Sequence, residues 1–289
     1  METKPTPDLM PSVPLPPDRY VLVNGINTRY WQLGERGSKI ILLHGGNGSI
    51  EFWLYNIATL AQNHQVYAFD MVGAGKSEAP DASYSLTYQA EFLHGWMSAL
   101  NIDTATLIGN SMGGGVALVF TGLYPERVDR LVLVASMGFG PEISLGIRLI
   151  TLPAIVNLLR PGRWMIPAML KSNFDDANNL PPEWIELRYP IFAISGRNQV
   201  ILQLGQSNFN LAGVLPAVYQ SILASLPTIT QKTLIVWGEG DRIIPVKHAY
   251  IAAEKILNSQ LHVFPNCGHH PHLEYPARFN QLVLEFLAN

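Results

Sequence analysis

A serine between two glycines is the residue of this chain best suited to covalent chemistry. It is Ser111, in Gly-Asn-Ser-Met-Gly, and it fits the pattern G-x-S-x-G. A serine hydroxyl is a weak nucleophile and needs a neighbouring base to take its proton. An apolar run precedes the motif and a helical pattern follows it, which is the setting of a nucleophile elbow. The alternative interpretation is a serine that caps a helix beside two packing glycines.

Two further residues are candidates for the base and for the acid that orients it. Asp241 follows the apolar run Thr-Leu-Ile-Val-Trp, and His269 follows a second run, Leu-His-Val-Phe-Pro. Chains with a nucleophile elbow carry their groups in the order serine, acid, histidine, and this chain keeps that order. Both residues would lie just beyond the carboxyl ends of strands, where open parallel sheets place their sites. Glu239 is an alternative acid, and a structural salt bridge is an alternative role for either carboxylate.

Three histidines stand within four positions, which also raises the possibility of a metal site. They are His269, His270 and His272. A zinc site needs three or four protein ligands, and no separate cluster of carboxylate or cysteine residues completes this group. We therefore expect no metal and no cofactor. We expect His270 and His272 to pack beside the site, and Cys267 to be a small buried residue of the same loop.

Strands and helices alternate along most of the chain. Apolar runs that suit strands buried on both faces cover residues 39–46, 65–70, 104–109, 129–135, 232–241 and 259–270. Helical patterns cover residues 87–101, 112–126, 246–258 and 276–288. This alternation predicts an α/β fold with a mostly parallel sheet and helices on both faces. It breaks at about 138–225, which we interpret as an inserted helical lid between two parts of one core, residues 20–137 and 226–289.

Composition limits the partners and the location. The chain has 289 residues, a formal net charge of -3 and no basic patch, so we expect no nucleic acid partner. One cysteine excludes an intrachain disulfide and agrees with a reducing compartment, so we expect a cytoplasmic protein. The proline-rich residues 1–19 are interpreted as an extended or disordered lead-in. Charged residues and proline interrupt the apolar stretch 149–170, so it is too short to span a membrane, but it is a candidate surface for contact with lipid.

Five segments in the expected order resemble the α/β-hydrolase family over nearly all of residues 20–289. They are LLHGGNG, DMVGAGKS, GNSMGG, WGEGDRIIP and NCGHHPHLEYPARFN. The resemblance implies that His269 is the base and that Asp241, at the end of a G-x-x-D pattern, is the acid. An elbow of this kind implies an oxyanion hole with one N–H from Met112. By analogy with the family, the second N–H comes from Gly46, with Asn47 as its neighbour.

Within this family the chain is similar to the meta-cleavage-product hydrolases, which cut a C–C bond beside a ketone in dienol acids. Asn110, before the serine, and Arg188, in the lid, match two of their substrate-binding residues. Each residue has a simpler alternative: Asn110 braces the turn, and Arg188 faces solvent or pairs with Glu183 or Glu186. Two departures are Tyr55, where those enzymes have asparagine, and His270, where they usually have tryptophan.

Three hypotheses follow from the sequence. The first is a serine hydrolase that acts on an ester of a small apolar carbonyl substrate. The second is a C–C bond hydrolase of the meta-cleavage type. The third is a ligand-binding member of the fold without turnover. If the substrate is a neutral ester, Arg188 has no carboxylate to bind, and its removal would change the activity little.

Overall fold

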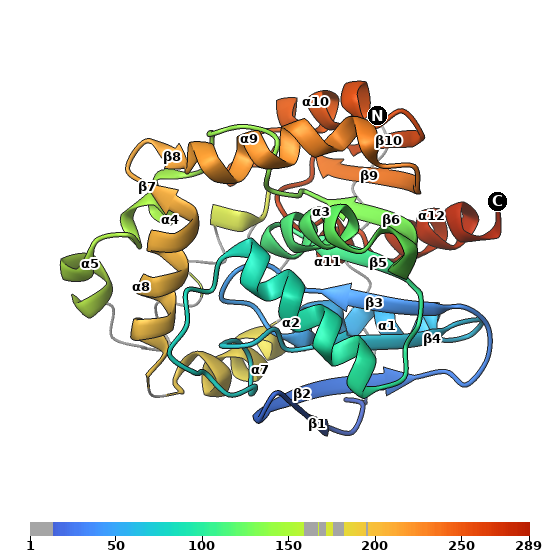
Figure 1. Cartoon of the computed structure of the whole chain (residues 1–289), viewed down its shortest axis with the longest axis horizontal. Coiled ribbons are helices and arrows are strands. Elements are labelled where there is room, and N and C mark those ends of the chain that lie inside the picture. Colours follow the sequence, from blue (N-terminus) through green and yellow to red (C-terminus); the bar gives the residue numbers. More distant parts are fainter. Residues whose placement is uncertain (1–13, 159–166, 168–171, 176–181, 195) are drawn as a thin grey trace.

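An eight-stranded sheet separates two layers of helices (Figure 1). The computed structural model describes residues 14–158, 167, 172–175, 182–194 and 196–289, without the side chains of residues 182, 183 and 185. The strand order is β1-β2-β4-β3-β5-β6-β9-β10. The strands are β1 (Arg19–Val23), β2 (Ile26–Leu33), β3 (Lys39–Leu43), β4 (Gln65–Phe69), β5 (Ala105–Asn110), β6 (Val128–Val134), β9 (Lys232–Gly238) and β10 (Ser259–Phe264).

The sheet is parallel except at one edge. β1 pairs antiparallel with β2, and β2 pairs antiparallel with β4, whereas the other neighbours are parallel. The parallel strands are buried on both faces: along β3, Ile41 and Leu43 enter one apolar cluster, while Ile40 and Leu42 enter the other. The predicted α/β fold with a mostly parallel sheet is therefore confirmed.

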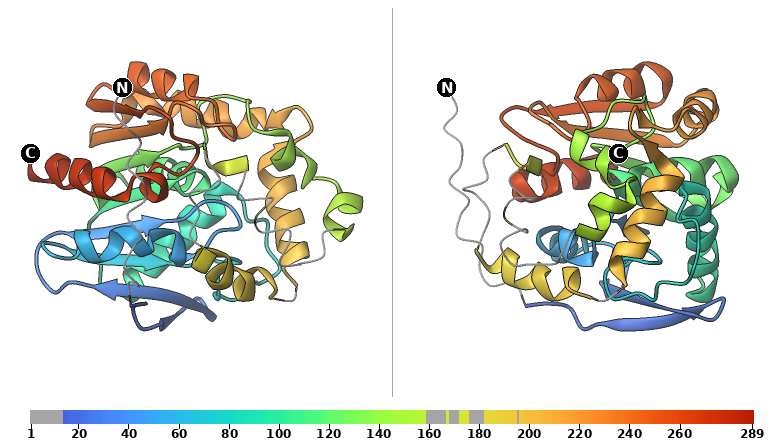
Figure 2. Two further views of the ribbon diagram at one scale, coloured as in Figure 1. Left: turned by 180° about the vertical axis from the view of Figure 1, so that it is seen from behind. Right: turned by 90° about the vertical axis from the view of Figure 1, so that its left-hand side faces the viewer.

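Each face of the sheet is covered by amphipathic helices. One face packs against α2 (Leu86–Ala99), α3 (Met112–Leu123) and α10 (Lys247–Lys255). The other face packs against α1 (Leu54–Leu60) and α12 (Pro276–Ala288), which lie in front in the rear view of Figure 2. The short helix α11 (Pro271–Glu274) leads into α12.

A mainly helical segment connects β6 to β9, although these two strands are direct neighbours in the sheet. We call residues 135–231 the inserted segment. Its described elements are α4 (Leu145–Leu149), α5 (Pro153–Leu158), α7 (Pro182–Phe192), α8 (Arg197–Asn208), the pair β7 (Phe209–Asn210) and β8 (Gly213–Val214), and α9 (Pro216–Ser225). The predicted lid, residues 138–225, falls within it. Much of the apolar stretch 149–170, and residues 1–13 of the predicted lead-in, lie outside the described residues.

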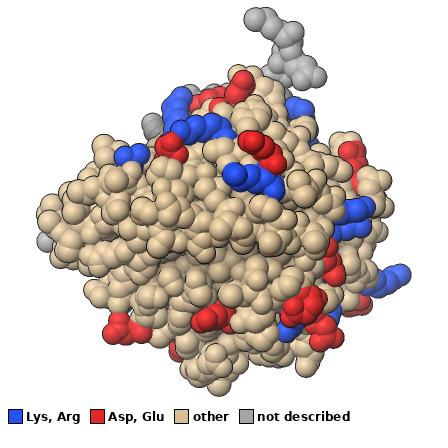
Figure 3. Space-filling model, turned by 45° about the horizontal axis from the view of Figure 1, so that its top comes forward, with Lys and Arg blue, Asp and Glu red and all other residues tan. Residues whose placement is uncertain are grey.

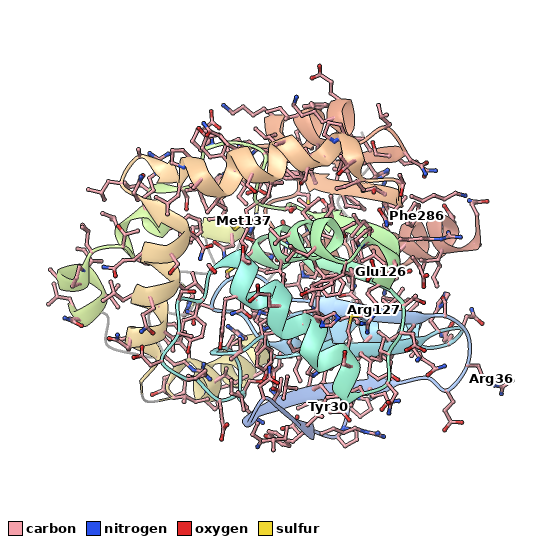
Figure 4. The ribbon with its side chains drawn as sticks, in the orientation of Figure 1. Tyr30, Arg36, Glu126, Arg127, Met137 and Phe286 are labelled. Atoms are coloured by element: carbon pink, nitrogen blue, oxygen red, sulfur yellow. The ribbon has the colours of Figure 1, made fainter. Side chains whose placement is uncertain are left out.

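The surface beside α9 and α10 carries both signs of charge without a gathering of either (Figure 3). Among the described residues, no helix combines the length and apolar character needed to cross a membrane. Figure 4 gives the orientation of the sheet: Met137, three residues after the end of β6, lies on the side of α4 and α8, and Arg36 and Phe286 lie at the opposite end. The carboxyl ends of the parallel strands therefore face the inserted segment.

Candidate active site

Ser111 sits on a sharp turn between β5 and α3. Its backbone dihedrals are φ 55° and ψ -119°, a conformation that costs free energy for any residue other than glycine. A Cβ at Gly113 would lie 2.4 Å from the carbonyl oxygen of Leu43, and one at Gly109 would lie 2.4 Å from that of Gly113. Both glycines are therefore required by backbone contacts, and the turn presents the serine at the carboxyl end of the sheet.

His269 and Asp241 form a buried pair beyond the ends of β10 and β9. The Nδ1 atom of His269 lies 2.8 Å from Oδ2 of Asp241. The other oxygen of Asp241 accepts backbone N–H groups of Ile243 at 2.8 Å and Ile244 at 3.0 Å. A carboxylate held in this way accepts a hydrogen bond from Nδ1–H of His269, which leaves Nε2 of His269 as the basic atom. Glu239, the alternative acid, is not part of this pair.

Ser111 and His269 line one cavity of about 450 Å³ at the end of the sheet. No direct hydrogen bond joins the two side chains among those of the described residues. Hydrogen bonds between catalytic groups are often long before a substrate binds. The cavity volume is within the range that encloses a small organic molecule.

The loop after β3 approaches the serine closely. A Cβ on Gly45 would lie 3.2 Å from that of Ser111, and one on Gly46 would lie 3.4 Å from Sδ of Met112. Met112 is the first residue of α3, so its N–H has no partner within the helix. Gly46, Asn47 and Met112 all line the cavity. The two N–H groups proposed for an oxyanion hole thus belong to residues on the cavity wall beside Ser111.

His44 braces this loop as a neutral side chain. Its Nε2 accepts the backbone N–H of Met71 at 3.1 Å, so the proton resides on Nδ1, which donates to the carbonyl of Gly45 at 2.8 Å. Burial lowers the pKa of His44 to about 3. A neutral His44 can therefore hold both contacts across the whole range of physiological pH.

Asn110 lies against the backbone of His269 and does not line the cavity in the described part of the chain. Its amide donates to the carbonyls of Val134 at 3.1 Å and His269 at 3.3 Å. Its oxygen accepts Nδ1 of His270 at 3.1 Å. Asn110 thus connects the turn of Ser111 to the loop of His269 and His270, which agrees with the alternative in which it braces the turn.

His270 lines the cavity, whereas His272 is not among the described residues that line it. His270 is 4% exposed, and burial, followed by the neighbouring His269, lowers its pKa well below the ordinary value. His272 is packed at a ring-centroid distance of 4.4 Å from Trp53. Both of its ring nitrogens are buried without a hydrogen-bond partner. No group of three or more metal-ligating side chains with suitable geometry occurs among the described residues.

Arg188 corrects one expectation. For a neutral substrate the sequence predicts that Arg188 faces solvent or pairs with Glu183 or Glu186. It does not face solvent, because it is 7% exposed and lines the cavity. Its guanidinium donates to the hydroxyl of Ser49 and to the carbonyl of Asn47, the latter at 3.2 Å. The side chain of Glu183 lies outside the described residues. Burial lowers the pKa of Arg188 to about 10, so the group stays cationic at neutral pH.

A second arginine on the wall was not predicted from the sequence. Arg197, the first residue of α8, donates to the backbone carbonyls of Gly73 and Gly75. It is 8% exposed and also lines the cavity. The sequence did contain a signal for this position: no charged residue follows Arg197 until Lys232. An isolated arginine in so long an uncharged stretch has few nearby partners in sequence.

Beneath the cavity, Asp70 joins the two loops that the arginines contact. One oxygen accepts the backbone N–H of Ile50 at 2.7 Å, and the other accepts that of Lys76 at 2.7 Å and pairs with Arg29 at 3.2 Å. Burial, and then the nearby Glu51, raise the pKa of Asp70 to about 6. Asp70 was also not predicted from the sequence. The signal that could have found it is its position directly after an apolar strand.

The fold and this geometry agree with comparisons to known proteins. A profile described as the alpha/beta hydrolase family matches residues 40–282. The chain belongs to the alpha/beta hydrolase family. It is 34% identical to 2-hydroxymuconate semialdehyde hydrolase of Pseudomonas putida, over 93% of this chain and 94% of that one.

Two further relatives cover nearly the whole chain. One is 2-hydroxy-6-oxo-6-phenylhexa-2,4-dienoate hydrolase of Burkholderia cepacia, 34% identical over 88% of this chain and 89% of that one. The other is a solved structure of a serine hydrolase involved in carbazole degradation, with a TM-score of 0.80 and 28% identity over 94% of this chain and 98% of that one. The predicted resemblance to meta-cleavage-product hydrolases is confirmed.

Proposed function

We propose that this protein is a serine hydrolase that cleaves a C–C bond next to a ketone in a substrate that carries a carboxylate. The observation that carries the proposal is the burial of Arg188 in the wall of the cavity that holds Ser111 and His269. This ranks the C–C hydrolase above the ester hydrolase, in reverse of the order that the sequence favoured. Relatives named for the hydrolysis of a dienoate and a muconate semialdehyde support it.

A buried guanidinium at this position is suited to an acidic ligand. Arg188 has five N–H donors, and its hydrogen bonds in the described residues are to the neutral oxygens of Ser49 and Asn47. A carboxylate can form a bidentate, charge-assisted pair with such a group. Arg197 adds a second positive charge to the same wall. The carboxylates beneath them, Glu51 and Asp70, favour the charged form of Arg188.

The residues of the cavity would share the work as follows. Nε2 of His269 takes the proton of Ser111 as the hydroxyl oxygen bonds to the ketone carbon. The N–H groups of Gly46 and Met112 stabilise the negative charge that forms on the ketone oxygen. The C–C bond then breaks, its electron pair stays on the departing carbon, and that carbon takes the proton from His269. Water then attacks the acyl carbon as His269 takes one of its protons. The bond from the acyl carbon to the oxygen of Ser111 breaks, that oxygen takes the proton back from His269, and a carboxylic acid is released.

The test compares two substrates with the purified protein. We expect a higher kcat/KM for 2-hydroxy-6-oxo-6-phenylhexa-2,4-dienoate, with release of benzoate, than for p-nitrophenyl butanoate. Rapid turnover of the ester without cleavage of the dienoate would reject the C–C assignment. Failure of both, together with failure of a fluorophosphonate probe to label Ser111, would instead support a ligand-binding protein without turnover.

Hydrolysis of an apolar ester is the second candidate, because much of the cavity wall is aliphatic. The aliphatic side chains on it include Ile143, Ile147, Leu149, Ile150, Ile155, Val200, Ile201 and Leu204. An acyl or alkyl chain would bury its surface there at a gain of roughly 25 cal/mol per Å². Tyr55, at the position where the C–C hydrolases have asparagine, is not among the lining residues described. Phe52 lines the cavity and supplies no hydrogen-bonding group there.

A further inference from the structure

We propose that Glu274 is a positioning residue that fixes the backbone of the catalytic base. The proposal rests on the role of His269 given above, but it does not depend on which bond is cleaved. Glu274 ends α11, five residues after His269, and its carboxylate turns back onto the loop that carries the base.

The carboxylate binds the peptide groups on both sides of His269. The N–H of Gly268 lies 2.9 Å from Oε1 and 3.0 Å from Oε2 of Glu274. The N–H of His270 lies 3.4 Å from Oε1. One side chain thus holds the residue before the base and the residue after it.

The same carboxylate binds the inserted segment. Its Oε2 accepts the N–H of Asp175 at 3.0 Å. Two residues earlier, the carbonyl of Asn173 accepts the N–H of His269 itself at 2.7 Å. Three consecutive N–H groups of the base loop, those of residues 268–270, are therefore bound by Glu274 or by the part of the inserted segment that Glu274 holds.

This arrangement does something that Asp241 cannot do. Asp241 fixes the tautomer and rotation of the imidazole through Nδ1, whereas Glu274 fixes where the Cα of His269 lies. Both are needed, because a displacement of about 1 Å in a catalytic group can reduce the rate about 100-fold. The loop has little internal regularity at this point, since β10 ends at Phe264 and α11 starts at Pro271.

The acceptor role requires an ionised carboxylate. Burial raises the pKa of Glu274, and the N–H groups of Asp175, Gly268 and His270 oppose that shift. The titratable groups that face it are Asp175 from the inserted segment and Cys267 from the base loop. Burial and the charge of Glu274 raise the pKa of Cys267, so this thiol stays neutral beside the carboxylate.

The test is Glu274→Gln, which keeps the size of the side chain and removes its charge. The matched control is Glu254→Gln, at an exposed position of α10. We expect Glu274→Gln to lower kcat about 10- to 100-fold, as for a misplaced catalytic group, with KM within about threefold because the cavity wall is retained. The proton NMR signal of Nδ1–H of His269 should also shift relative to the control. A kcat and a proton signal equal to those of the control would overturn the proposal.

Two measurements keep its failure distinct from other failures. Full activity in His269→Ala would reject His269 as the base, whereas loss in His269→Ala with normal Glu274→Gln would reject only the role of Glu274. If Glu274→Gln does not fold, amide hydrogen exchange of the wild-type protein decides. Slow exchange at Gly268, His270 and Asp175 supports the clamp, and exchange at the rate of unprotected amides overturns it.

Discussion

The guanidinium carbon of Arg188 lies 4.6 Å from the centre of the Phe52 ring. Phe52 belongs to a short 3₁₀ helix, Ile50–Trp53, that follows the loop after β3. Arg188 belongs to α7 of the inserted segment. A cation over an aromatic ring in a dry site is stabilised by about 2 kcal/mol. The inserted segment therefore meets the core through a charged group on the wall of the cavity that holds Ser111 and His269.

Arg188→Ala should separate the two leading functions. For a substrate with a carboxylate, the loss of its buried partner should lower kcat/KM. The loss corresponds to on the order of 2–4 kcal/mol of transition-state binding free energy. For a neutral ester the loss should be less than about tenfold, equivalent to 1.4 kcal/mol. The measurement is kcat/KM for both substrates with Arg148→Ala as the control, since Arg148 is in the same segment but not among the lining residues. A large loss with neutral esters as well would indicate that Arg188 acts by holding the loop of Ser49 and Asn47.

Ser111→Ala should abolish turnover without unfolding the protein. The members of a catalytic triad act as a unit, so removal of the nucleophile is expected to lower kcat by on the order of 10³ or more. Ser144→Ala is the control, because Ser144 also lines the cavity. The measurement is steady-state hydrolysis together with labelling by a fluorophosphonate. Turnover within a few-fold of wild type would mean that Ser111 is not the nucleophile.

His269→Ala should match that loss, whereas His270→Ala and His272→Ala should not. Only His269 is hydrogen-bonded to Asp241, and His272 lies between Trp53 and Phe279, away from the cavity wall. The comparison is kcat of the three folded variants, each with its melting temperature. Equal losses in all three that added zinc reverses would revive the metal site.

The elements that position the site could be predicted because their signals are local. The run 104–109 predicts β5 to within one residue, and the pattern 276–288 is α12 itself. The antiparallel strands β1 and β2, which end the sheet on one side, were missed although a signal was present. Asn24 and Gly25 form a two-residue turn in which both residues have positive φ. An Asn-Gly turn of this kind is a strong sequence signal for a β-hairpin.

What the sequence could not predict depends on contacts between distant segments. The pattern around Arg188 predicts a helix but not which face is buried, because Ser49 and Phe52 lie more than 130 residues away. The pairing of Arg29 with Asp70 has no local signature either. Burial of a charge is decided by tertiary packing, and the ranking of the two hydrolase functions turned on one such burial.

The last prediction concerns pH and the buried His272. Burial lowers its folded-state pKa from 6.5 to about 3. Between these values the unfolded chain binds a proton that the folded chain does not, so this residue makes stability fall as pH decreases from 6.5. Its contribution between pH 7 and pH 5 is about 2 kcal/mol, from a gap of about 1.5 pH units at 1.36 kcal/mol each.

His272→Phe isolates that contribution, because phenylalanine does not titrate and keeps a ring between Trp53 and Phe279. The raised pKa of Asp70, about 6, acts in the opposite direction, but it is present in both proteins and cancels in the difference. We expect the variant to be at least as stable as wild type at pH 7, since two unpaired ring nitrogens are removed. From pH 7 to pH 5 it should lose about 2 kcal/mol less unfolding free energy than wild type. Urea unfolding at several pH values measures both slopes, and equal slopes would mean that water or a partner reaches His272 in the folded state.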